Sequence, residues 1–400
     1  MSNIIYGSSR SEGANWTDRL DPLYELEYSD MLSAQWTAEQ LHQPTLRVTE
    51  SGVVKPVVDS VPFVTKRPWN KTHSGRAIMV FAVLSEFNQM TTMQIASLLQ
   101  LEAGYVESTL EELMLAGIVL RLDAGSDVNR DKSTRGIWRV LRSGDNPRLR
   151  EWVSALTPLE YALISNGVPV ELISGSNQPT ATQHNLMTNE MMLRAMEVNP
   201  AIIGAWCERH ARMIDMYEQA RFDESVARRN IADGILVTRN GKVIVIESSG
   251  SSLVTKKNGQ NKNSLVHKAA AWVAVCAYSE LDIRVVFVDI SNRPDVDRLR
   301  KYVSIGVEIE SQTYVSRNAY RQEGAAKIYV ADGREWFPAA RALTDDFVWM
   351  RAYNAFSHHQ ENIIDDDDLV TDQNSDIVKN TLAAMHVPAW IKNMPDMKIA

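Results

Sequence analysis

Cysteine and long apolar runs are what this sequence has least of. Its 400 residues include two cysteines, Cys207 and Cys276, which are too few for a disulfide framework or a four-cysteine zinc site. No run of about 18 apolar residues occurs, so we expect no membrane-spanning segment. The opening residues MSNIIYGSSRSEG have no basic segment followed by an apolar one. We therefore expect no signal peptide and a cytoplasmic location.

A surplus of positive charge is missing as well. The formal net charge is −8, which argues against a histone-like protein that coats DNA through charge alone. Aspartate is concentrated after residue 340, and an unbroken run of it occupies positions 365–368. We expect this acidic C-terminal segment, residues 336–400, to be mobile and to compete with DNA for basic surfaces elsewhere in the chain.

Residues 73–145 carry the pattern of a small helical domain with a hairpin. Apolar side chains recur at helical spacing over 74–84, 91–101 and 102–117, and Gly117 stands where helices commonly end in a left-handed residue. IVLRL and GIWRVLR then read as two antiparallel strands joined by a polar turn. This order predicts a winged helix-turn-helix domain. A dimerisation or docking element of the same build is the alternative.

Residues 150–335 have the pattern of an α/β domain, while residues 1–72 are predicted as an N-terminal extension. After helical sequence over 149–165, HNLMTNEMMLRAME predicts an amphipathic helix, and AIIGAWCERHARMI fits either a strand or the end of a helix. IADGILVTRN and GKVIVIESSG predict two strands joined at Asn240–Gly241. A helix at SLVHKAAAWVAVCAYSE and a buried strand at IRVVFVDI follow. The order predicts a small α/β sheet with helices on both faces.

Two acidic residues flank the predicted hairpin. Asp233 lies at the start of the first strand and Glu247 at the end of the second, so both lie at one end of the sheet. A two-residue turn would set Asp233 opposite Ser248, whereas a three-residue turn, 239–241, would set it opposite Glu247. Paired carboxylates on rigid strands suit Mg²⁺, so Asp233 and Glu247 are the predicted metal ligands. Simple loop-capping carboxylates are the alternative.

A restriction-type metal site also uses a lysine, and its usual position holds another residue here. The motif is an Asp followed later by a Glu, one further residue and a Lys, but Ser249 stands in the lysine position. Because a serine hydroxyl carries no charge, we expect weak or absent hydrolysis unless another cation replaces the lysine. The candidates are Lys268 on the following helix and Lys256 and Lys257 in the loop before it.

The stretch 183–272 resembles the replication-relaxation family of bacterial plasmids, phages and integrative elements. The residues that carry the resemblance are His184, Asn189, Trp206, Glu208, Arg209, Asp233, Glu247, Gly250 and Lys268. The family also has a winged helix upstream, which matches 74–142. The resemblance implies a restriction-endonuclease-like αβββαβ core that works with DNA in plasmid or phage replication or transfer. Ala232, where the family tends to have proline, and Ser249 depart from its pattern.

Three further residues of this stretch are candidates for the same site. His184, on the helix before the sheet, would orient a phosphate or a water, with a helix cap or a core position as the alternative. Glu190 and Glu208 are additional carboxylates that could reach the same end of the sheet. The predicted catalytic set is therefore Asp233, Glu247, Lys268 and His184.

Basic residues gather on the predicted wing rather than on the third helix of the winged-helix segment. That helix carries only acidic charges, at Glu102, Glu107, Glu111 and Glu112, and they would repel phosphate. Cations on the hairpin and in the loop 251–263 are the predicted DNA contacts. They are Arg121, Arg130, Lys132, Arg135, Arg139, Lys256 and Lys257.

These features predict a DNA-binding accessory protein of a mobile element, with a nuclease-like core that is weak or inactive. One alternative is an active metal-dependent DNA endonuclease that uses Asp233 and Glu247. The other is a regulator or assembly protein that uses both domains for protein contacts. Double-stranded DNA is the expected partner, and replication or transfer proteins and a second copy of the chain are further candidates. Mg²⁺ is the candidate cofactor, and no membrane contact is expected.

Overall fold

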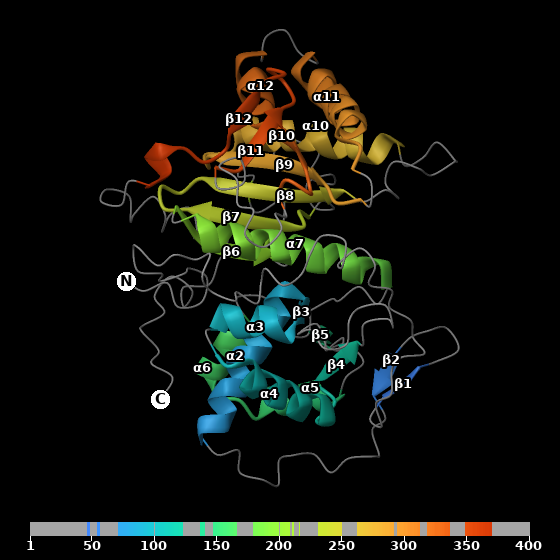
Figure 1. Ribbon diagram of the computed structural model, residues 1–400, viewed down its shortest axis with the longest axis vertical. Helices are drawn as coiled ribbons and strands as arrows, with labels where there is room; N and C mark the ends of the chain where they lie inside the picture. The colour runs from blue at the N-terminus through green and yellow to red at the C-terminus, as the bar shows by residue number, and fades with distance from the viewer. Residues whose placement is uncertain are drawn as a thin grey trace. The chain divides into compact units, whose positions relative to one another are not determined.

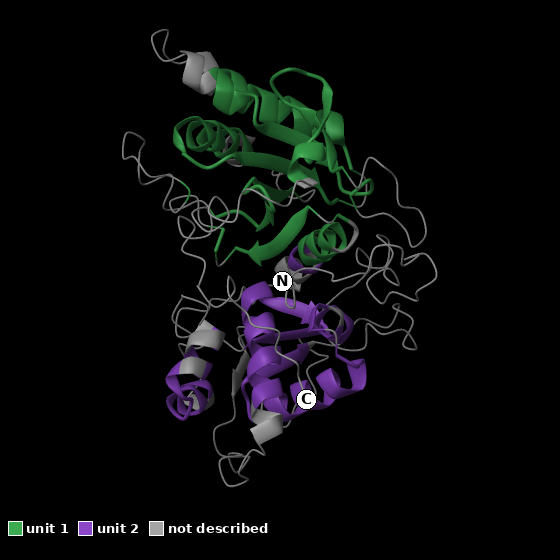
Figure 2. Ribbon diagram, turned by 90° about the vertical axis from the view of Figure 1, so that its left-hand side faces the viewer, with its two compact units in different colours: residues 1–17, 27–29, 187–400 green, residues 18–26, 30–186 purple. Residues whose placement is uncertain are grey.

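The protein is a mixed α/β chain of two compact units (Figures 1 and 2). Unit 1 consists of Met1–Thr17, Glu27–Ser29 and Met187–Ala400, and unit 2 of Asp18–Leu26 and Asp30–Leu186. The computed structural model describes residues 46–48, 54–56, 71–99, 101–122, 137–140, 147–165, 179–199, 201–208, 210–211, 216, 231–249, 262–291, 294–312, 318–336 and 349–369. Five of the predicted DNA contacts lie outside these ranges: Arg130, Lys132, Arg135, Lys256 and Lys257. None of the described helices is both long and apolar enough to cross a membrane.

Unit 2 contains the predicted helices and hairpin of residues 73–145, together with one strand that the sequence did not reveal. Its elements are α2 (Lys71–Phe87), β3 (Gln89–Thr91), α3 (Thr92–Leu99), α4 (Ala103–Leu115), β4 (Val119–Leu122) and β5 (Ile137–Val140). The strands pair antiparallel in the order β3-β5-β4. Two short antiparallel strands, β1 (Leu46–Val48) and β2 (Val54–Pro56), lie in the predicted N-terminal extension.

Local side-chain chemistry fixes the ends of the helices in unit 2. Thr91 and Gln94 form a reciprocal capping box, in which each side-chain oxygen accepts the other residue's backbone N–H at 3.0 and 2.9 Å. Gly117 has a φ of 74° and ends α4, as the sequence predicted. Between these ends, the indole of the fully buried Trp138 donates to Thr92 Oγ1 at 2.9 Å and ties β5 to α3.

Two short helices belong to unit 2, although the sequence analysis placed them in the following domain. These are α5 (Pro147–Ser154) and α6 (Pro158–Ser165). The Trp152 ring meets the Phe81 ring of α2 edge to face, with centroids 5.0 Å apart, and Ser85 of α2 donates to the carbonyl of Ile164 at 3.4 Å. These contacts pack α5 and α6 on α2 within unit 2.

Unit 1 is built on a seven-stranded sheet with the order β12-β11-β10-β9-β8-β7-β6. Its elements are α7 (Pro179–Val198), β6 (Ile202–Cys207), β7 (Gly234–Thr238), β8 (Val243–Ser249), α10 (Lys262–Tyr278), β9 (Ile283–Asp289), α11 (Val296–Gln312), α12 (Asn318–Ala325), β10 (Ile328–Asp332), β11 (Arg351–Asn354) and β12 (Gln360–Asn362). Strands β8, β9 and β10 run parallel, and the other pairings are antiparallel. The segment AIIGAWC is thus a strand, which settles the alternative left open by the sequence.

The main core of unit 1 lies between one face of the sheet and the helices α10, α11 and α12. Alternate residues of β8 point to this face, and Val245 packs there with Trp272 of α10 and Val303 of α11. The helices lie close together because small residues stand at their contacts. A Cβ placed on Gly306 of α11 would lie 2.8 Å from the Cβ of Ala269 of α10.

The acidic C-terminal segment is partly incorporated into the fold of unit 1, contrary to the sequence prediction of a mobile tail over 336–400. Strands β11 and β12 extend the sheet, and the short 3-10 helix η9 (Asp366–Leu369) follows them. Lys242, beside the β7–β8 turn, donates to Asp368 at 2.6 Å and to Asp365 at 3.3 Å. Asp368 is fully buried. For residues 349–369 the prediction is wrong, because a buried lysine holds the aspartate run.

Candidate functional site

The β7–β8 hairpin brings Asp233 to the end of β8 that carries Glu247. Gly234 pairs with Ile246, and the N–H of Asp233 donates to the carbonyl of Ile246 at 3.1 Å, so Asp233 lies immediately outside the last paired residue of β7. The turn is the three-residue alternative, 239–241, closed by a Thr238 N–H to Lys242 carbonyl bond of 3.0 Å. Gly241 has a φ of 89°, which suits the last position of such a turn.

Four side chains form a compact group at this end of the sheet, called here the Glu247 cluster: Asp233, Glu247, Lys268 and Trp272. Glu247 Oε1 accepts the indole N–H of Trp272 at 2.6 Å. Its other oxygen, Oε2, lies 2.5 Å from Lys268 Nζ. Asp233 Oδ2 accepts the backbone N–H of Ser248 at 2.7 Å. The carboxylates are thus held by donors from both β8 and α10.

Helix α10 brings the positive charge that the strand motif lacks. Lys268 and Trp272 are four residues apart, so they share one face of the helix. His267, next in sequence to the lysine, is exposed. Lys268 Nζ also donates to the carbonyl of Ile231 at 3.2 Å, which fixes its position beside Asp233. The sequence pattern predicted Lys268 but not Trp272, although the four-residue spacing between them is a signal that could have revealed it.

Ser249 follows the cluster on the same face of β8, since it stands two residues after Glu247. Its hydroxyl is buried, and within the described part of the chain it has no hydrogen-bond partner. Ser248 points to the opposite face, where its hydroxyl lies 2.7 Å from that of Thr188 on α7. The position that a lysine usually occupies therefore holds a buried hydroxyl that is able to donate to a further oxygen.

Burial sets the protonation state of Glu247. The residue is 2% exposed, and this burial raises the pKa of its carboxyl from 4.5 to about 7; Lys268 lowers that pKa and Asp233 raises it. For Lys268, burial lowers the pKa of the ammonium, but Glu247 and Asp233 outweigh it and the net shift is upward. The lysine therefore stays protonated, whereas the buried Glu247 carboxyl keeps its proton to about pH 7.

The polar face of α7 contributes further buried groups near β6 and β8. Glu190 and Arg194 form an ion pair of 2.9 Å with both side chains fully buried. Cys207 of β6 donates to Asn189 at 3.0 Å. Glu190, considered above as an additional site carboxylate, is thus committed to Arg194. Glu208 is close enough to Lys268 to raise its pKa.

Three other predicted site residues that the structure describes, His184, Arg121 and Arg139, lie in unit 2. His184 belongs to the part of α7 that falls in that unit. Arg121 lies 3.8 and 3.9 Å from Glu107 and Glu111 of α4 and stacks over Trp138. Arg139 is only 6% exposed. Both arginines are thus largely covered within unit 2, and their role as DNA contacts stays a prediction.

The donor set of the Glu247 cluster fits a hard divalent cation that keeps much of its water. Mg²⁺ is commonly held by one or two carboxylates together with waters and substrate phosphates, and Asp233 and Glu247 supply two such groups. Among the described residues, no group of three or more histidine, cysteine or acidic side chains has metal-site geometry.

No known family model, curated protein or solved structure matches this chain.

Proposed function

We propose that unit 1 is a divalent-metal-dependent DNA phosphodiesterase, in a DNA-processing protein similar to the replication-relaxation family. The observation that carries the proposal is the meeting of Asp233, Glu247 and Lys268 at one end of the sheet. The element order α7-β6-β7-β8-α10-β9 supports a restriction-endonuclease-like core, because it follows the αβββαβ arrangement. The lysine of such a core then comes from the helix instead of from the strand.

Each side chain of the Glu247 cluster has a distinct role in this proposal. Asp233 and Glu247 would hold Mg²⁺, which supplies Lewis-acid polarisation of the phosphate and of a water when it is bound. Lys268 offers its ammonium to the charge that develops on the phosphate. Trp272 orients Glu247 through the indole N–H, as second groups around ligands commonly do. Because binding of the ion requires an ionised Glu247, it should release a proton below about pH 7.

Unit 2 supplies the proposed attachment to DNA. The order of α2, β3, α3, α4, β4 and β5 with a β3-β5-β4 sheet supports a winged helix-turn-helix. Arg121 lies beside two carboxylates of α4 and partly offsets their charge. We expect this unit to bind duplex DNA mainly through phosphates, with Arg130, Lys132 and Arg135 of the wing as the contacts.

A second candidate function is a DNA-binding accessory protein of a mobile element whose core does not cleave. Ser249 favours it, because the strand position of the usual lysine holds an uncharged side chain. The two candidates differ in one respect only, which is whether Lys268 replaces that lysine in the reaction.

Nicking of a supercoiled plasmid in Mg²⁺ or Mn²⁺ separates the two candidates. We expect cleavage by the full chain, its loss in Asp233→Asn and Glu247→Gln, and a fall of about 10²–10³ in rate for Lys268→Met. Glu280→Gln, which removes an exposed carboxylate near the end of α10, is the matched control. Cleavage that survives Glu247→Gln would remove the proposed activity. Binding without any cleavage would favour the accessory protein.

A further inference from the structure

Ser249 is the last residue of β8 and lies at the carboxyl end of the parallel strands β8, β9 and β10. The residue is 4% exposed, and no group in the described ranges forms a hydrogen bond with its hydroxyl. Folded proteins pair nearly all of their buried polar groups, because an unpaired one lowers stability. An unpaired buried hydroxyl therefore points to a partner that binds to the chain from outside.

The alternation of side chains along β8 places Ser249 on the face that carries Glu247. The two residues are two positions apart, which is about 6.6 Å along a strand. Ser248, between them, points to the other face, where its hydroxyl lies 2.7 Å from that of Thr188. Of the two neighbouring serines, Ser248 has its partner within the described chain, whereas Ser249 faces the Glu247 cluster with an unused donor.

Asp289 is the residue of β9 that pairs with Ser249, and its carboxylate is already used. Its Oδ1 accepts the backbone N–H of Ser291 at 2.9 Å, and its Oδ2 accepts that of Asp295 at 2.9 Å. The carboxylate therefore closes the turn between β9 and α11. The neighbouring strand thus leaves the hydroxyl of Ser249 to another acceptor.

The Glu247 cluster is accessible from solvent on the side of Lys268. The lysine side chain is 27% exposed, and Asp233 is partly exposed. An ammonium group attracts anions, and a charged oxygen forms a stronger hydrogen bond with a hydroxyl than a neutral oxygen does. An anion with several oxygens therefore fits this place, because one oxygen can contact Lys268 while another contacts Ser249.

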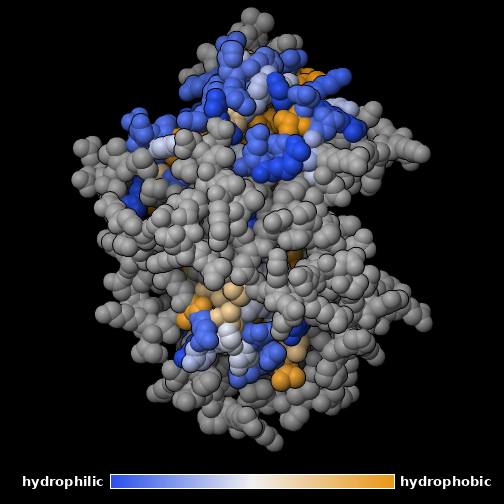
Figure 3. Space-filling model, viewed as in Figure 1, coloured by the Kyte–Doolittle hydropathy of each residue, from blue (hydrophilic) through white to orange (hydrophobic). Residues whose placement is uncertain are grey.

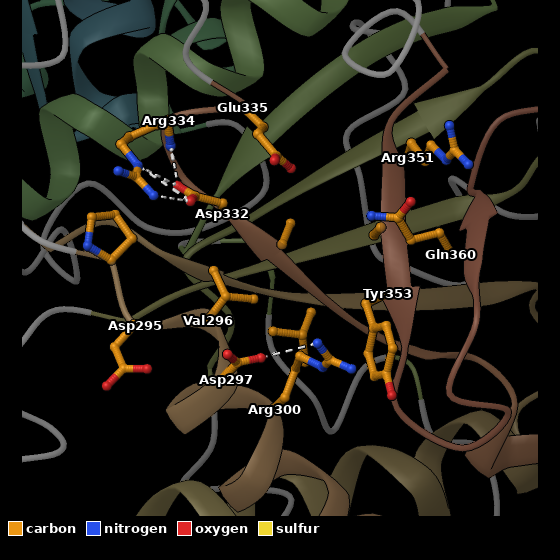
Figure 4. A pocket seen from close by; sticks show the side chains of 14 residues that line it. Asp295, Val296, Asp297, Arg300, Asp332, Arg334, Glu335, Arg351, Tyr353 and Gln360 are labelled. Atoms are coloured by element: carbon orange, nitrogen blue, oxygen red, sulfur yellow. Dashed lines mark hydrogen bonds and ion pairs between the residues drawn. The ribbon is translucent and has the colours of Figure 1, made fainter.

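Charged groups elsewhere on the described surface of unit 1 are paired with one another. On the face seen in Figure 3, this surface is mostly hydrophilic, with small hydrophobic areas between charged ones. A polar pocket of about 590 Å³ lies at the carboxyl end of β10 (Figure 4). Within it Arg300 donates to Asp297 at 3.1 Å, and Arg334 donates to Asp332 at 3.2 Å. The pocket at Arg300 thus balances its own charges and suits an anion less well than Lys268 and Ser249 do.

We propose that Ser249 donates a hydrogen bond to a non-bridging oxygen of the DNA phosphate that binds at the Glu247 cluster. The inference rests on the function proposed above. Lys268 supplies charge from α10 and Ser249 supplies a directed donor from β8, so the phosphate is fixed from two elements. Because the hydroxyl is already out of water, it gives up no hydration when the phosphate arrives. Ser249 is thus a substrate-binding residue.

Phosphorus NMR of the thymidine dinucleotide TpT, titrated with the full chain in Mg²⁺, tests this contact. The shift of the diester signal reports binding, and a new monoester signal reports cleavage. Ser249→Ala should raise the dissociation constant of TpT about tenfold or more, as expected for a lost hydrogen bond to a charged oxygen. Ser304→Ala is the matched control, since it removes a hydroxyl of α11 that donates to the carbonyl of Ala355 at 3.3 Å. It should change the constant by no more than about twofold.

Sulfur substitution in TpT separates a direct hydrogen bond from an indirect effect. Sulfur is a weak acceptor, and one of the two phosphorothioate diastereomers carries it in place of the oxygen that Ser249 contacts. That diastereomer should bind the wild type about tenfold more weakly than TpT does. The loss should shrink in Ser249→Ala, which has no hydroxyl to lose. Sulfur effects of equal size in the wild type and in Ser249→Ala, for both diastereomers, would overturn the proposal.

Thermal unfolding of the free chain tests whether the hydroxyl of Ser249 has a structural role instead. Ser249→Ala should melt at or above the wild-type temperature, because it removes an unpaired buried group. Ser248→Ala should melt lower, since it breaks the bond to Thr188. A lower melting temperature for Ser249→Ala would overturn the proposal.

The two signals of TpT also separate this contact from the proposed cleavage. Weaker binding in Ser249→Ala without a monoester signal in the wild type would support the contact and remove the cleavage. Cleavage with equal affinities in Ser249→Ala and Ser304→Ala would support the cleavage and overturn the contact. A wild type that does not bind TpT at all would overturn both.

Discussion

Replacement of Lys268 by methionine tests how far the buried Glu247 carboxyl depends on the ammonium beside it. Lys268 Nζ lies 2.5 Å from Glu247 Oε2, and Glu247 is 2% exposed. Burial raises the pKa of Glu247 from 4.5 to about 7 even with the lysine present, and the lysine lowers this pKa. Lys268→Met should therefore raise the pKa of Glu247 above about 7.

The sign of the pH dependence follows from proton release. In the unfolded chain Glu247 has its ordinary pKa of 4.5, whereas in the folded protein burial raises this pKa to about 7. The contribution of Glu247 to the stability of the folded state therefore falls as pH rises from about 4.5 to about 7. In Lys268→Met this loss of stability continues above pH 7, and each further pH unit lowers the free energy of unfolding by about 1.4 kcal/mol until the carboxyl has ionised. At about pH 8.5 the variant should be less stable than the wild type by up to about 2 kcal/mol, with a much smaller difference at about pH 6.

Urea unfolding at several pH values measures this difference. Hydrogen exchange of the β8 amides assigns the transition to unit 1. The double variant Glu247→Gln, Lys268→Met is the control, since it has no carboxyl to titrate and its stability relative to Glu247→Gln should be nearly independent of pH. A stability loss in Lys268→Met of the same size at pH 6 and pH 8.5 would refute the reasoning.

Three other predictions concern the packing of unit 1, the first with a comparison variant in unit 2. Gly306→Ala should destabilise the protein by about 1–3 kcal/mol in urea unfolding, because the added Cβ meets α10. In the comparison variant Gly104→Ala in α4, the nearest atom to the added Cβ is 3.9 Å away. This variant should instead stabilise the protein by up to about 1 kcal/mol. Lys242→Met should lower the free energy of unfolding by about 3–5 kcal/mol, because it leaves the fully buried Asp368 without its cation. A decrease below about 1 kcal/mol would mean that this ion pair is solvated. Trp272→Phe should keep the ring packing but lower Mn²⁺ affinity about 10-fold or more, and unchanged affinity would show that the indole does not position Glu247.

Local patterns in the sequence predicted the hairpin site well. The Asn-Gly turn, the apolar strands and the acidic residues at their ends are all short-range features, and they were enough to identify Asp233 and Glu247 as neighbours. The register was open, because two- and three-residue turns both fit the sequence. The partners of Glu247 on α10 depend on how the helix packs against the sheet, which no local pattern encodes.

The domain boundaries were harder to predict for the same reason. α5 and α6 are short helices, and long-range contacts with α2 assign them to unit 2: that of Trp152 with Phe81 for α5 and that of Ile164 with Ser85 for α6. The aspartate run at 365–368 looked solvated because its charge is so dense. Its partner, Lys242, is 126 residues away in the chain from Asp368, and a long-range ion pair of this kind leaves no trace in composition. The pocket at Arg300 likewise forms from elements that are far apart in sequence.

Binding of Mn²⁺ to the full chain, followed by electron paramagnetic resonance, tests the central claim most directly. The account predicts a site that binds more tightly as pH rises through about 7, because Glu247 must ionise. Glu247→Gln and Asp233→Asn should each abolish that site, whereas Glu280→Gln should leave it intact. Mn²⁺ binding that is the same in Glu247→Gln and in the wild type would contradict the account.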